Sequence, residues 1–342
     1  MTVPLVRVAG SPFDRGRLHG AARAAALRAF LDDDLCRLNR ILPAPVSMKT
    51  LRPVLADYHR EISSAIPQLL EEIHGLAAGA GIEVEQAVLL QVRREIMGYQ
   101  RIPVMGDCTT YARLGDQVLA QTIDLNGDLD DQVCVLDTGR ALVLSFAGLL
   151  GYLGVNDHGL AIGLNLVLGG DWRPGVPPYL AIRHLLDTAA SVGDALAALD
   201  GLRLASSRSL TLCDTERALH VEILGDQLRV VGSAEEPRTN HFLHPDFVAA
   251  DELNVFARNS SVLRRDSCAA ALAELPAGAG VDDHFAVLGR PPVRVDDTGD
   301  IRREKTVATV VVRPGRRELH VRRGAGASDT HTFRLGREHA DV

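Results

Sequence analysis

Hydrophobic and polar residues recur with a helical period through the first hundred residues and with the shorter period of strands through much of the rest. Helical spacing predicts helices over about 13–38, 51–77 and 82–97. A Ser11-Pro12 pair supplies a start signal for the first of them. Pro67 marks either a break in the second helix or the first-turn proline of a new one.

From residue 109 the apolar runs become short and are separated by turns rich in Gly, Asn and Asp. The first five runs predict consecutive antiparallel strands in a meander: VLAQTID, QVCVLDT, ALVLSFA, YLGVND and LAIGLNLVL. Two helices are predicted next, over 178–188 and 192–199. The remaining predictions are strands at 209–214, 218–224 and 227–232, a helix at 259–275, and strands at 306–312 and 317–323.

Helices and strands therefore occur in separate blocks along the chain. This order favours an α+β layered architecture over a doubly wound parallel sheet. We expect the most flexible stretches to be 276–304 and the tail after Gly324.

Composition excludes several classes of protein. The 342 residues are 46% hydrophobic and 24% charged, which is too apolar for a disordered chain. No apolar run approaches the ~20 residues of a membrane span, and the start lacks a signal-peptide pattern. A net charge of -7 without a basic block argues against a nucleic-acid partner. Five cysteines without a CxxC pair suit a reduced compartment, and we expect a cytoplasmic location.

Cys108 stands where the helical block ends and the strand block begins. A cysteine that opens a strand shortly after Gly106 is suited to be a nucleophile held at the end of a sheet. The alternative is a small buried hydrophobe that starts an ordinary strand.

Several motifs around Cys108 follow one another in a family-specific order. They are GSPFDRGRLHG at 10–20, EEIHGLAAGAG at 71–81, CTT at 108–110, QTID at 121–124, GVNDHGLAIGLN at 154–165, TNHF at 239–242 and TVATV at 306–310. Together they resemble the penicillin acyltransferase-like family of N-terminal nucleophile (Ntn) hydrolases and, more distantly, the bile acid hydrolases and penicillin V acylases. The resemblance implies a four-layer αββα sandwich over 108–342, preceded by a helical leader over 1–107.

The resemblance also implies that the chain cuts itself between Asp107 and Cys108, like a zymogen, into fragments of 107 and 235 residues. Cleavage would free the α-amine of Cys108. With an ordinary pKa of roughly 7.7–8.0, that amine can serve as general base for its own thiol.

Four further roles come from matching positions in the family. Asp124 would orient the amine of Cys108, Asn165 and Asn240 would donate hydrogen bonds to the oxyanion, and Arg264 would hold the nucleophile region. Alternatives remain for each: a turn aspartate, a strand-end asparagine, a turn asparagine, and a surface arginine, with Arg265 competing for the last role. Gln121 stands where bile acid hydrolases carry an arginine, which points to the acyltransferase-like branch.

The implied activity is hydrolysis or transfer of an acyl group through an acyl-Cys108 intermediate. The expected partner is a small-molecule acyl amide or acyl thioester, with an amine acceptor in the case of transfer. The leader and core fragments are expected to stay associated. We expect no cofactor, no metal and no membrane partner; the pair His241 and His244 lacks a third ligand at convincing spacing. Oligomeric state is left open.

Asp107 departs from the family, which usually has glycine before the nucleophile. Glycine adopts strained backbone conformations more freely than aspartate, so cleavage could be slow or absent. Two other hypotheses follow: an uncleaved member that binds an acyl or peptide ligand without catalysis, and a cysteine hydrolase that uses an internal histidine without cleavage.

Overall fold

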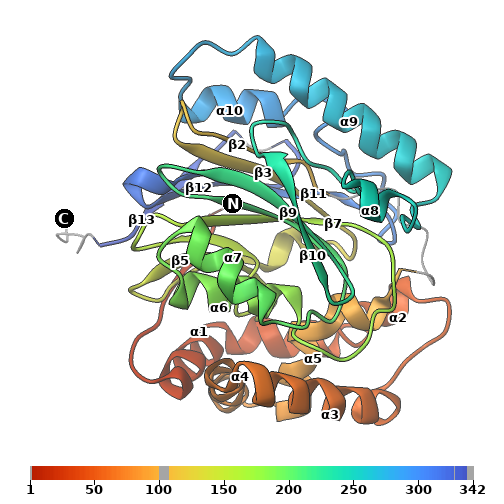
Figure 1. The fold of residues 1–342 in the computed structure, drawn as a ribbon. Coiled ribbons are helices and arrows are strands. Elements are labelled where there is room, and N and C mark those ends of the chain that lie inside the picture. Colours follow the sequence, from red (N-terminus) through yellow and green to blue (C-terminus); the bar gives the residue numbers. More distant parts are fainter. Residues whose placement is uncertain (1, 100–107, 327, 337–342) are drawn as a thin grey trace.

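The computed structural model describes residues 2–99, 108–326 and 328–336, and two β-sheets form its centre (Figure 1). The α-helices of this part are α1 (Pro12–Asp32), α2 (Leu38–Ile41), α3 (Met48–Ala65), α4 (Pro67–Ala80), α5 (Val84–Met97), α6 (Pro178–Thr188), α7 (Val192–Asp200), α8 (Pro245–Val248), α9 (Val255–Ala273) and α10 (Val281–Leu288). Short 3₁₀ turns occur at Leu129–Gln132 and Pro314–Arg316.

The larger sheet has eight strands, in the order β1-β4-β5-β6-β7-β8-β9-β10. All neighbours are antiparallel except β1, which pairs in parallel with β4. The strands are β1 (Leu5–Arg7), β4 (Val133–Asp137), β5 (Ala141–Phe146), β6 (Leu153–Asn156), β7 (Ala161–Leu166), β8 (Arg208–Cys213), β9 (Ala218–Leu224) and β10 (Gln227–Ser233).

The second sheet has five antiparallel strands, in the order β13-β12-β11-β3-β2. They are β2 (Thr110–Arg113), β3 (Val118–Leu125), β11 (Lys305–Arg313), β12 (Glu318–Arg323) and β13 (His331–Arg334). The predicted meander was therefore wrong at its first member, because β3 belongs to this sheet and the chain crosses to the other one between Asn126 and Gln132.

The two sheets face each other and helices cover their outer sides, as predicted for an αββα sandwich (Figure 1). Helix α10 packs on β11 and β3 of the five-stranded sheet, with α9 beside it. Helices α6 and α7 pack on β5 to β8 of the eight-stranded sheet. Because both faces of the central strands are covered, β3, β5 and β7 are buried almost along their whole length.

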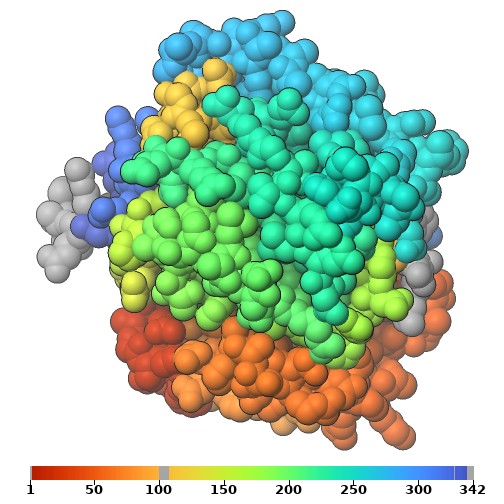
Figure 2. Space-filling model, in the orientation of Figure 1, coloured from red at the N-terminus to blue at the C-terminus, as the bar shows by residue number. Residues whose placement is uncertain are grey.

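Helices α1 to α5 form a further layer along one side of the sandwich, coloured red to orange in Figures 1 and 2. Helices α1 and α4 approach closely through glycines. A Cβ added at Gly16 would lie 1.8 Å from Glu72 O, and one at Gly75 would lie 2.0 Å from Phe13 O. The glycines of the two leader motifs thus permit backbone contact between the helices, which larger residues would prevent.

Several predicted boundaries need correction. The first helix ends at Asp32, because three successive aspartates oppose the helix dipole and residues 34–37 adopt left-handed conformations. Pro67 is the first residue of a new helix, α4, where its missing N–H costs nothing. Strand β1 was not predicted, since it is only three residues long.

Both stretches predicted to be flexible contain regular structure. Residues 276–304 include α10, which buries Phe285, Val287 and Leu288 against the five-stranded sheet. The tail after Gly324 includes β13, which extends that sheet by pairing with β12. In both cases the polar composition concealed a short element that is held by long-range packing. Within the described ranges, no helix has the length and apolar character needed to cross a membrane.

Candidate active site

Cys108 lies at the start of the five-stranded sheet, two residues before β2, and is only 2% exposed. Its Sγ atom lies 3.7 Å from the hydroxyl oxygen of Tyr152. Its φ angle is 21°, a value that L residues rarely adopt and that costs on the order of 1–3 kcal/mol. The sulfur is therefore buried against an aromatic side chain, on a strained backbone.

Two side chains from distant elements converge on the backbone carbonyl of Cys108. Asn165, at the end of β7, donates to it through Nδ2 at 2.9 Å. Arg264, in α9, donates through Nη1 at 3.0 Å. Both side chains are buried, so the carbonyl is held by donors from each of the two sides of the sandwich.

Asn240 joins the same network through Arg264. The Nη2 atom of Arg264 donates to Asn240 Oδ1 at 2.6 Å, and Asn240 Nδ2 donates to the carbonyl of Leu166 at 2.9 Å. The backbone N–H of Asn240 donates to Ser261 Oγ at 2.8 Å. Asn165 and Asn240 both donate to backbone carbonyls in this structure, and their contact with a substrate oxyanion stays a prediction.

Asp124 lies within β3 and is fully buried, rather than in the turn that follows. Its carboxylate accepts hydrogen bonds from the hydroxyls of Thr306 at 2.6 Å and Thr122 at 3.2 Å. The Thr122 hydroxyl in turn accepts from the backbone N–H of Thr109 at 3.0 Å. One bridging hydroxyl thus connects Asp124 to the residue that follows Cys108.

The structure shows which of the two arginines, Arg264 or Arg265, contacts the region around Cys108. Arg264 is 1% exposed and directs its guanidinium to Cys108 and Asn240. Arg265, one residue further along α9, has a partly exposed side chain that pairs with Asp266 at 3.2 Å. The helical rotation between consecutive residues points one arginine inward and the other outward.

Gln121 links the two sheets. Its amide donates to the carbonyl of Leu164 at 2.8 Å and accepts from the N–H of Leu164 at 3.0 Å. Gly163 makes room for it, since a Cβ there would lie 2.7 Å from Gln121 Oε1. Gln121 therefore contributes to the alignment of β7, which carries Asn165, with β3, which carries Asp124.

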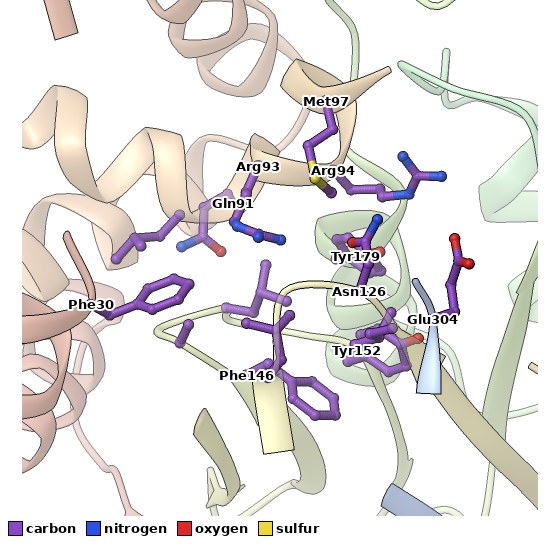
Figure 3. Close-up of a pocket in the computed structure, with 15 residues that line it drawn as sticks. Phe30, Gln91, Arg93, Arg94, Met97, Asn126, Phe146, Tyr152, Tyr179 and Glu304 are labelled. Atoms are coloured by element: carbon purple, nitrogen blue, oxygen red, sulfur yellow. The ribbon is translucent and has the colours of Figure 1, made fainter. Parts of the chain in front are cut away.

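Tyr152, whose hydroxyl oxygen lies 3.7 Å from Cys108 Sγ, also lines a small cavity, of which Cys108 itself is not a lining residue (Figure 3). Phe146, Tyr152 and Tyr179 form an aromatic wall, with ring centroids 5.0 and 5.1 Å apart. The leader supplies the opposite wall. Its lining residues are Phe30, Leu90, Gln91, Arg93, Arg94 and Met97. Sequence reasoning missed this cavity, because no motif marks residues that meet only through tertiary packing.

Burial shapes the electrostatics of the cavity. It raises the pKa of the Tyr179 hydroxyl to about 12, so this tyrosine is neutral at physiological pH. Burial lowers the pKa of Arg93 to about 10, with Arg94 and Arg37 acting in the same direction. Asn126 and Glu304 complete the polar part of the lining.

The four other cysteines are buried thiols. Burial raises the pKa of Cys36, Cys213 and Cys268 to about 12, and it also raises the pKa of Cys134. Because the thiolate is the nucleophilic form, these four are poorly suited to nucleophilic catalysis.

Of the histidines singled out from the sequence, His241 and His244 have structural contacts, whereas both ring nitrogens of His19 are buried without a hydrogen-bond partner. His19 is 1% exposed, and burial, reinforced by Arg183 and Arg23, lowers its pKa to about 3. His241 lies 2.8 Å from Ser261 Oγ, and His244 caps α8. In the part of the chain that the structure describes, no three His, Cys, Asp or Glu residues are grouped so that they could hold a metal ion. Asp107 lies outside the described residues.

The chain is similar to known proteins in sequence and in fold. A family model described as acyl-coenzyme A:6-aminopenicillanic acid acyl-transferase matches residues 112–280. A curated protein from Emericella nidulans, the 40 kDa form of acyl-coenzyme A:6-aminopenicillanic-acid-acyltransferase, is 25% identical over 189 residues, which cover 53% of this chain. The match spans about half of that relative, 52% of its length.

Two solved variants of the conjugated bile acid hydrolase from Clostridium perfringens share the fold. Each has a TM-score of 0.50, with 12% and 14% sequence identity. Each alignment covers 68% of this chain, and 93% and 94% of the two solved chains. These similarities show that the chain has the fold of the conjugated bile acid hydrolases and that its residues 112–280 resemble the acyl-coenzyme A:6-aminopenicillanic acid acyl-transferase family.

Proposed function

We propose that this protein cuts its own chain before Cys108 and then hydrolyses or transfers an acyl group through an acyl-Cys108 thioester. The observation that carries the proposal is the convergence of Asn165 and Arg264 on the carbonyl of Cys108, with Asp124 tied to the next residue. An ordinary buried cysteine at the start of a strand needs no such set of buried polar contacts, each of which has a desolvation cost.

The proposed self-cleavage begins when the Cys108 thiol adds to the carbonyl carbon of Asp107. The C–N bond breaks as the thiol proton passes to the leaving nitrogen, and a thioester joins Asp107 to the sulfur. Water then hydrolyses the thioester, which leaves a carboxylate on Asp107 and a thiol and free amine on Cys108. The positive φ of Cys108 supports this step, because cleavage removes the peptide plane that defines the strained angle.

After cleavage, the α-amine of Cys108 takes the proton from its own thiol as the sulfur attacks the acyl carbonyl of a substrate. The buried carboxylate of Asp124 would keep the resulting ammonium in place. Asn165 and Asn240 would donate to the oxyanion, a kind of contact whose loss typically slows catalysis by about 10²–10³. The C–N or C–S bond of the substrate then breaks, the leaving amine or thiol takes the proton, and water or an amine accepts the acyl group.

The cavity limits the class of acyl group. Its aromatic wall of Phe146, Tyr152 and Tyr179 favours an apolar chain close to the sulfur. The name of the Emericella relative refers to an acyl-coenzyme A donor and a 6-aminopenicillanic acid acceptor. We therefore propose acyl-coenzyme A thioesters and acyl amides as the first donors to test, with water and 6-aminopenicillanic acid as acceptors.

Contacts between the leader and the core support the proposal that the two fragments stay together. Glu72 of α4 makes a two-pronged pair with Arg183 of α6, at 2.9 and 3.0 Å, and both side chains are buried. Glu95 of α5 pairs with Arg208 of β8 at 3.0 Å. Cleavage at 107/108 would leave all of these contacts intact.

Asp107 favours a second candidate, an uncleaved protein that binds an acyl or peptide ligand at the same cavity. Such a protein would lack the free amine that activates the thiol. Its Cys108 would react slowly with iodoacetamide at neutral pH, whereas a poised thiolate would react rapidly.

Intact mass and N-terminal sequencing of the purified protein test the proposal first. The expected result is a 235-residue fragment that begins with Cys108. The change Cys108→Ala should keep the chain whole and abolish acyl transfer, whereas the matched control Cys268→Ala, at another buried cysteine, should be cleaved like the natural protein. Asp107→Gly should speed cleavage. An intact chain that is fully active after Cys108→Ala would contradict the proposal.

An intact but active chain that loses activity on Cys108→Ala and on replacement of one histidine would instead indicate a conventional cysteine hydrolase. A chain that stays intact, is inactive on all donors and labels slowly would indicate the binding protein. These outcomes differ in mass, activity and labelling rate, so one set of samples separates them.

A further inference from the structure

Tyr152 stands just before β6, and its hydroxyl lies 3.7 Å from the sulfur of Cys108. Its ring is held from two sides. It stacks on Tyr179, with ring centroids 5.1 Å apart, and meets Phe146 edge to face at 5.0 Å (Figure 3). The residue is only 2% exposed. The two neighbouring rings therefore restrict the positions that the hydroxyl can take, and water has little access to it.

The loop that carries Tyr152, between β5 and β6, is fixed by side chains from both parts of the chain. Gln91 of α5 donates to the carbonyl of Gly148 at 3.0 Å and accepts from the N–H of Leu150 at 3.0 Å. Arg183 of α6 donates to the carbonyl of Leu150 at 3.1 Å. The backbone that leads to Tyr152 is thus held at three points, and the position of the hydroxyl follows from tertiary contacts.

The contact between the hydroxyl and the sulfur changes in strength along the proposed reaction. A neutral thiol is a weak donor and a weak acceptor, so at this stage either atom can donate and the contact contributes little. Once the thiol has lost its proton, only the hydroxyl can donate, since a phenol ordinarily keeps its proton to a higher pH than a thiol. The hydrogen bond is then charge-assisted and stronger. An interaction that strengthens as the charge forms lowers the barrier of the step that forms it.

Tyr152 contacts a different atom of Cys108 from the one that Asn165 and Arg264 hold. Those two side chains donate to the backbone carbonyl, whereas the hydroxyl of Tyr152 faces the sulfur. A change at Tyr152 therefore leaves the backbone contacts of Cys108 in place. It also leaves the charged groups around the pair, which belong to other elements: Arg93 and Arg94 of α5, Asp124 of β3, Arg208 of β8, Arg264 of α9 and Glu304 before β11.

We propose that Tyr152 is a catalytic residue that donates a hydrogen bond to the Cys108 sulfur whenever the sulfur carries negative charge. The inference rests on the proposed function and adds a group to its mechanism. As the α-amine of Cys108 takes the thiol proton, the hydroxyl stabilises the thiolate that attacks the acyl carbonyl. When the acyl thioester later breaks, the sulfur leaves as a thiolate, receives the same hydrogen bond and takes a proton back from the α-ammonium. The tyrosine keeps its own proton throughout.

Reaction of Cys108 with iodoacetamide tests this inference without any turnover, because the thiolate is the form that reacts. The rate is measured from pH 5 to pH 10 by mass spectrometry of the peptide that contains Cys108. Tyr152→Phe should move the midpoint of the rate profile up by about one pH unit and slow the reaction at pH 7 about 10-fold, as one lost hydrogen bond to a charged group allows. At the alkaline end, where the thiol is ionised in both proteins, the two rates should converge. Tyr58→Phe, at a buried tyrosine of α3, should keep the natural profile.

Kinetics with a model amide extend the test to the reaction itself. The same sulfur attacks in self-cleavage and in acyl transfer, so Tyr152→Phe should slow the appearance of the fragments. It should also lower kcat about 10-fold with little change in KM, because the hydrogen bond forms only with the charged sulfur. Phenylalanine keeps the ring that packs on Phe146 and Tyr179, so the melting temperature should stay close to that of the natural protein.

An iodoacetamide profile that is identical in the natural protein and in Tyr152→Phe would overturn the inference. So would a reaction slowed by the same factor at every pH, which would indicate an altered pocket and not a lost donor. Failure of the proposed function has a different signature: the chain stays intact and no acyl amide or thioester is turned over, while the profile still reports whether the hydroxyl of Tyr152 stabilises the thiolate.

Discussion

The guanidinium of Arg264 donates a 3.0 Å hydrogen bond to the backbone carbonyl of Cys108, although 156 residues separate the two in the chain. The same guanidinium also donates to Asn240. We therefore propose that Arg264 is a positioning residue, which would act on the reaction by holding the backbone of the proposed nucleophile and the amide of Asn240.

Replacement of Arg264 should slow both self-cleavage and acyl transfer. Loss of a charge-assisted hydrogen bond of about 1.5–3 kcal/mol predicts that Arg264→Gln lowers the rate roughly 10- to 100-fold. Arg264→Lys, which keeps the charge, should recover part of the cleavage rate. The measurements are the rate of fragment appearance by mass spectrometry and kcat for a model amide. Arg265→Gln is the matched control, and an equal loss in both variants would contradict a specific role for Arg264.

The glycine contact between α1 and α4 should be intolerant of even one methyl group. A Cβ at Gly75 would lie 2.0 Å from Phe13 O, so Gly75→Ala must push the two helices apart and should cost about 1–3 kcal/mol. In α7, a Cβ at Gly193 meets only Ser191 Oγ at 3.6 Å, so Gly193→Ala should stabilise the protein by up to about 1 kcal/mol. Urea unfolding of both variants checks the opposite signs; equal effects would show that the close approach is unimportant.

The buried pair of Glu72 and Arg183 should matter far more than an exposed pair between the same parts of the chain. Glu72→Gln leaves Arg183 charged and buried, with only Asp187 nearby, and should cost about 3–5 kcal/mol. The double change Glu72→Leu with Arg183→Met should recover much of that loss.

The control for this pair is Glu61, which contacts Arg203 at 2.8 Å with both side chains partly exposed. Glu61→Gln should change the free energy of unfolding by less than about 1 kcal/mol. Thermal and urea unfolding of the four proteins test the prediction, and a Glu72→Gln effect no larger than that of Glu61→Gln would refute it.

Acid should destabilise the folded chain through His19. Burial lowers the pKa of His19 to about 3, against an ordinary value near 6.5, so below pH 6.5 the unfolded chain binds a proton that the folded chain does not. The contribution of this group to the free energy of unfolding is therefore full above pH 6.5 and decreases as the pH falls toward 3. At pH 5 the loss is about 2 kcal/mol.

The variant His19→Leu should show a smaller loss of stability between pH 7.5 and pH 5 than the natural protein. His158, whose side chain is half exposed, provides the control, since His158→Leu should leave the pH dependence unchanged. Urea unfolding at the two pH values is the measurement. An identical pH dependence in all three proteins would show that His19 does not titrate in this way.

Local patterns were sufficient for most elements of the fold. Helix α6 begins and ends where its periodicity predicts, at Pro178 and Thr188, and a proline at its first position marks the start. The strands from β4 to β10 follow the predicted runs, since turn residues separate them. Local patterns did not show which of the two sheets contains β3, because a buried strand has the same hydrophobic pattern in either sheet.

The sequence by itself determined that Cys108 lies at the boundary between helices and strands. The resemblance of its motifs to a known family added Asp124, Asn165, Asn240 and Arg264 or Arg265 as candidate partners. Only the tertiary structure placed Arg264 inward and Arg265 outward, and only it joined Arg93, Phe30 and Tyr152 in one cavity. The physical reason is that helix and turn signals depend on neighbouring residues. A site depends on which side chains come into contact when α5, the two sheets and α9 pack together. Patterns of neighbouring residues do not show which distant side chains these are.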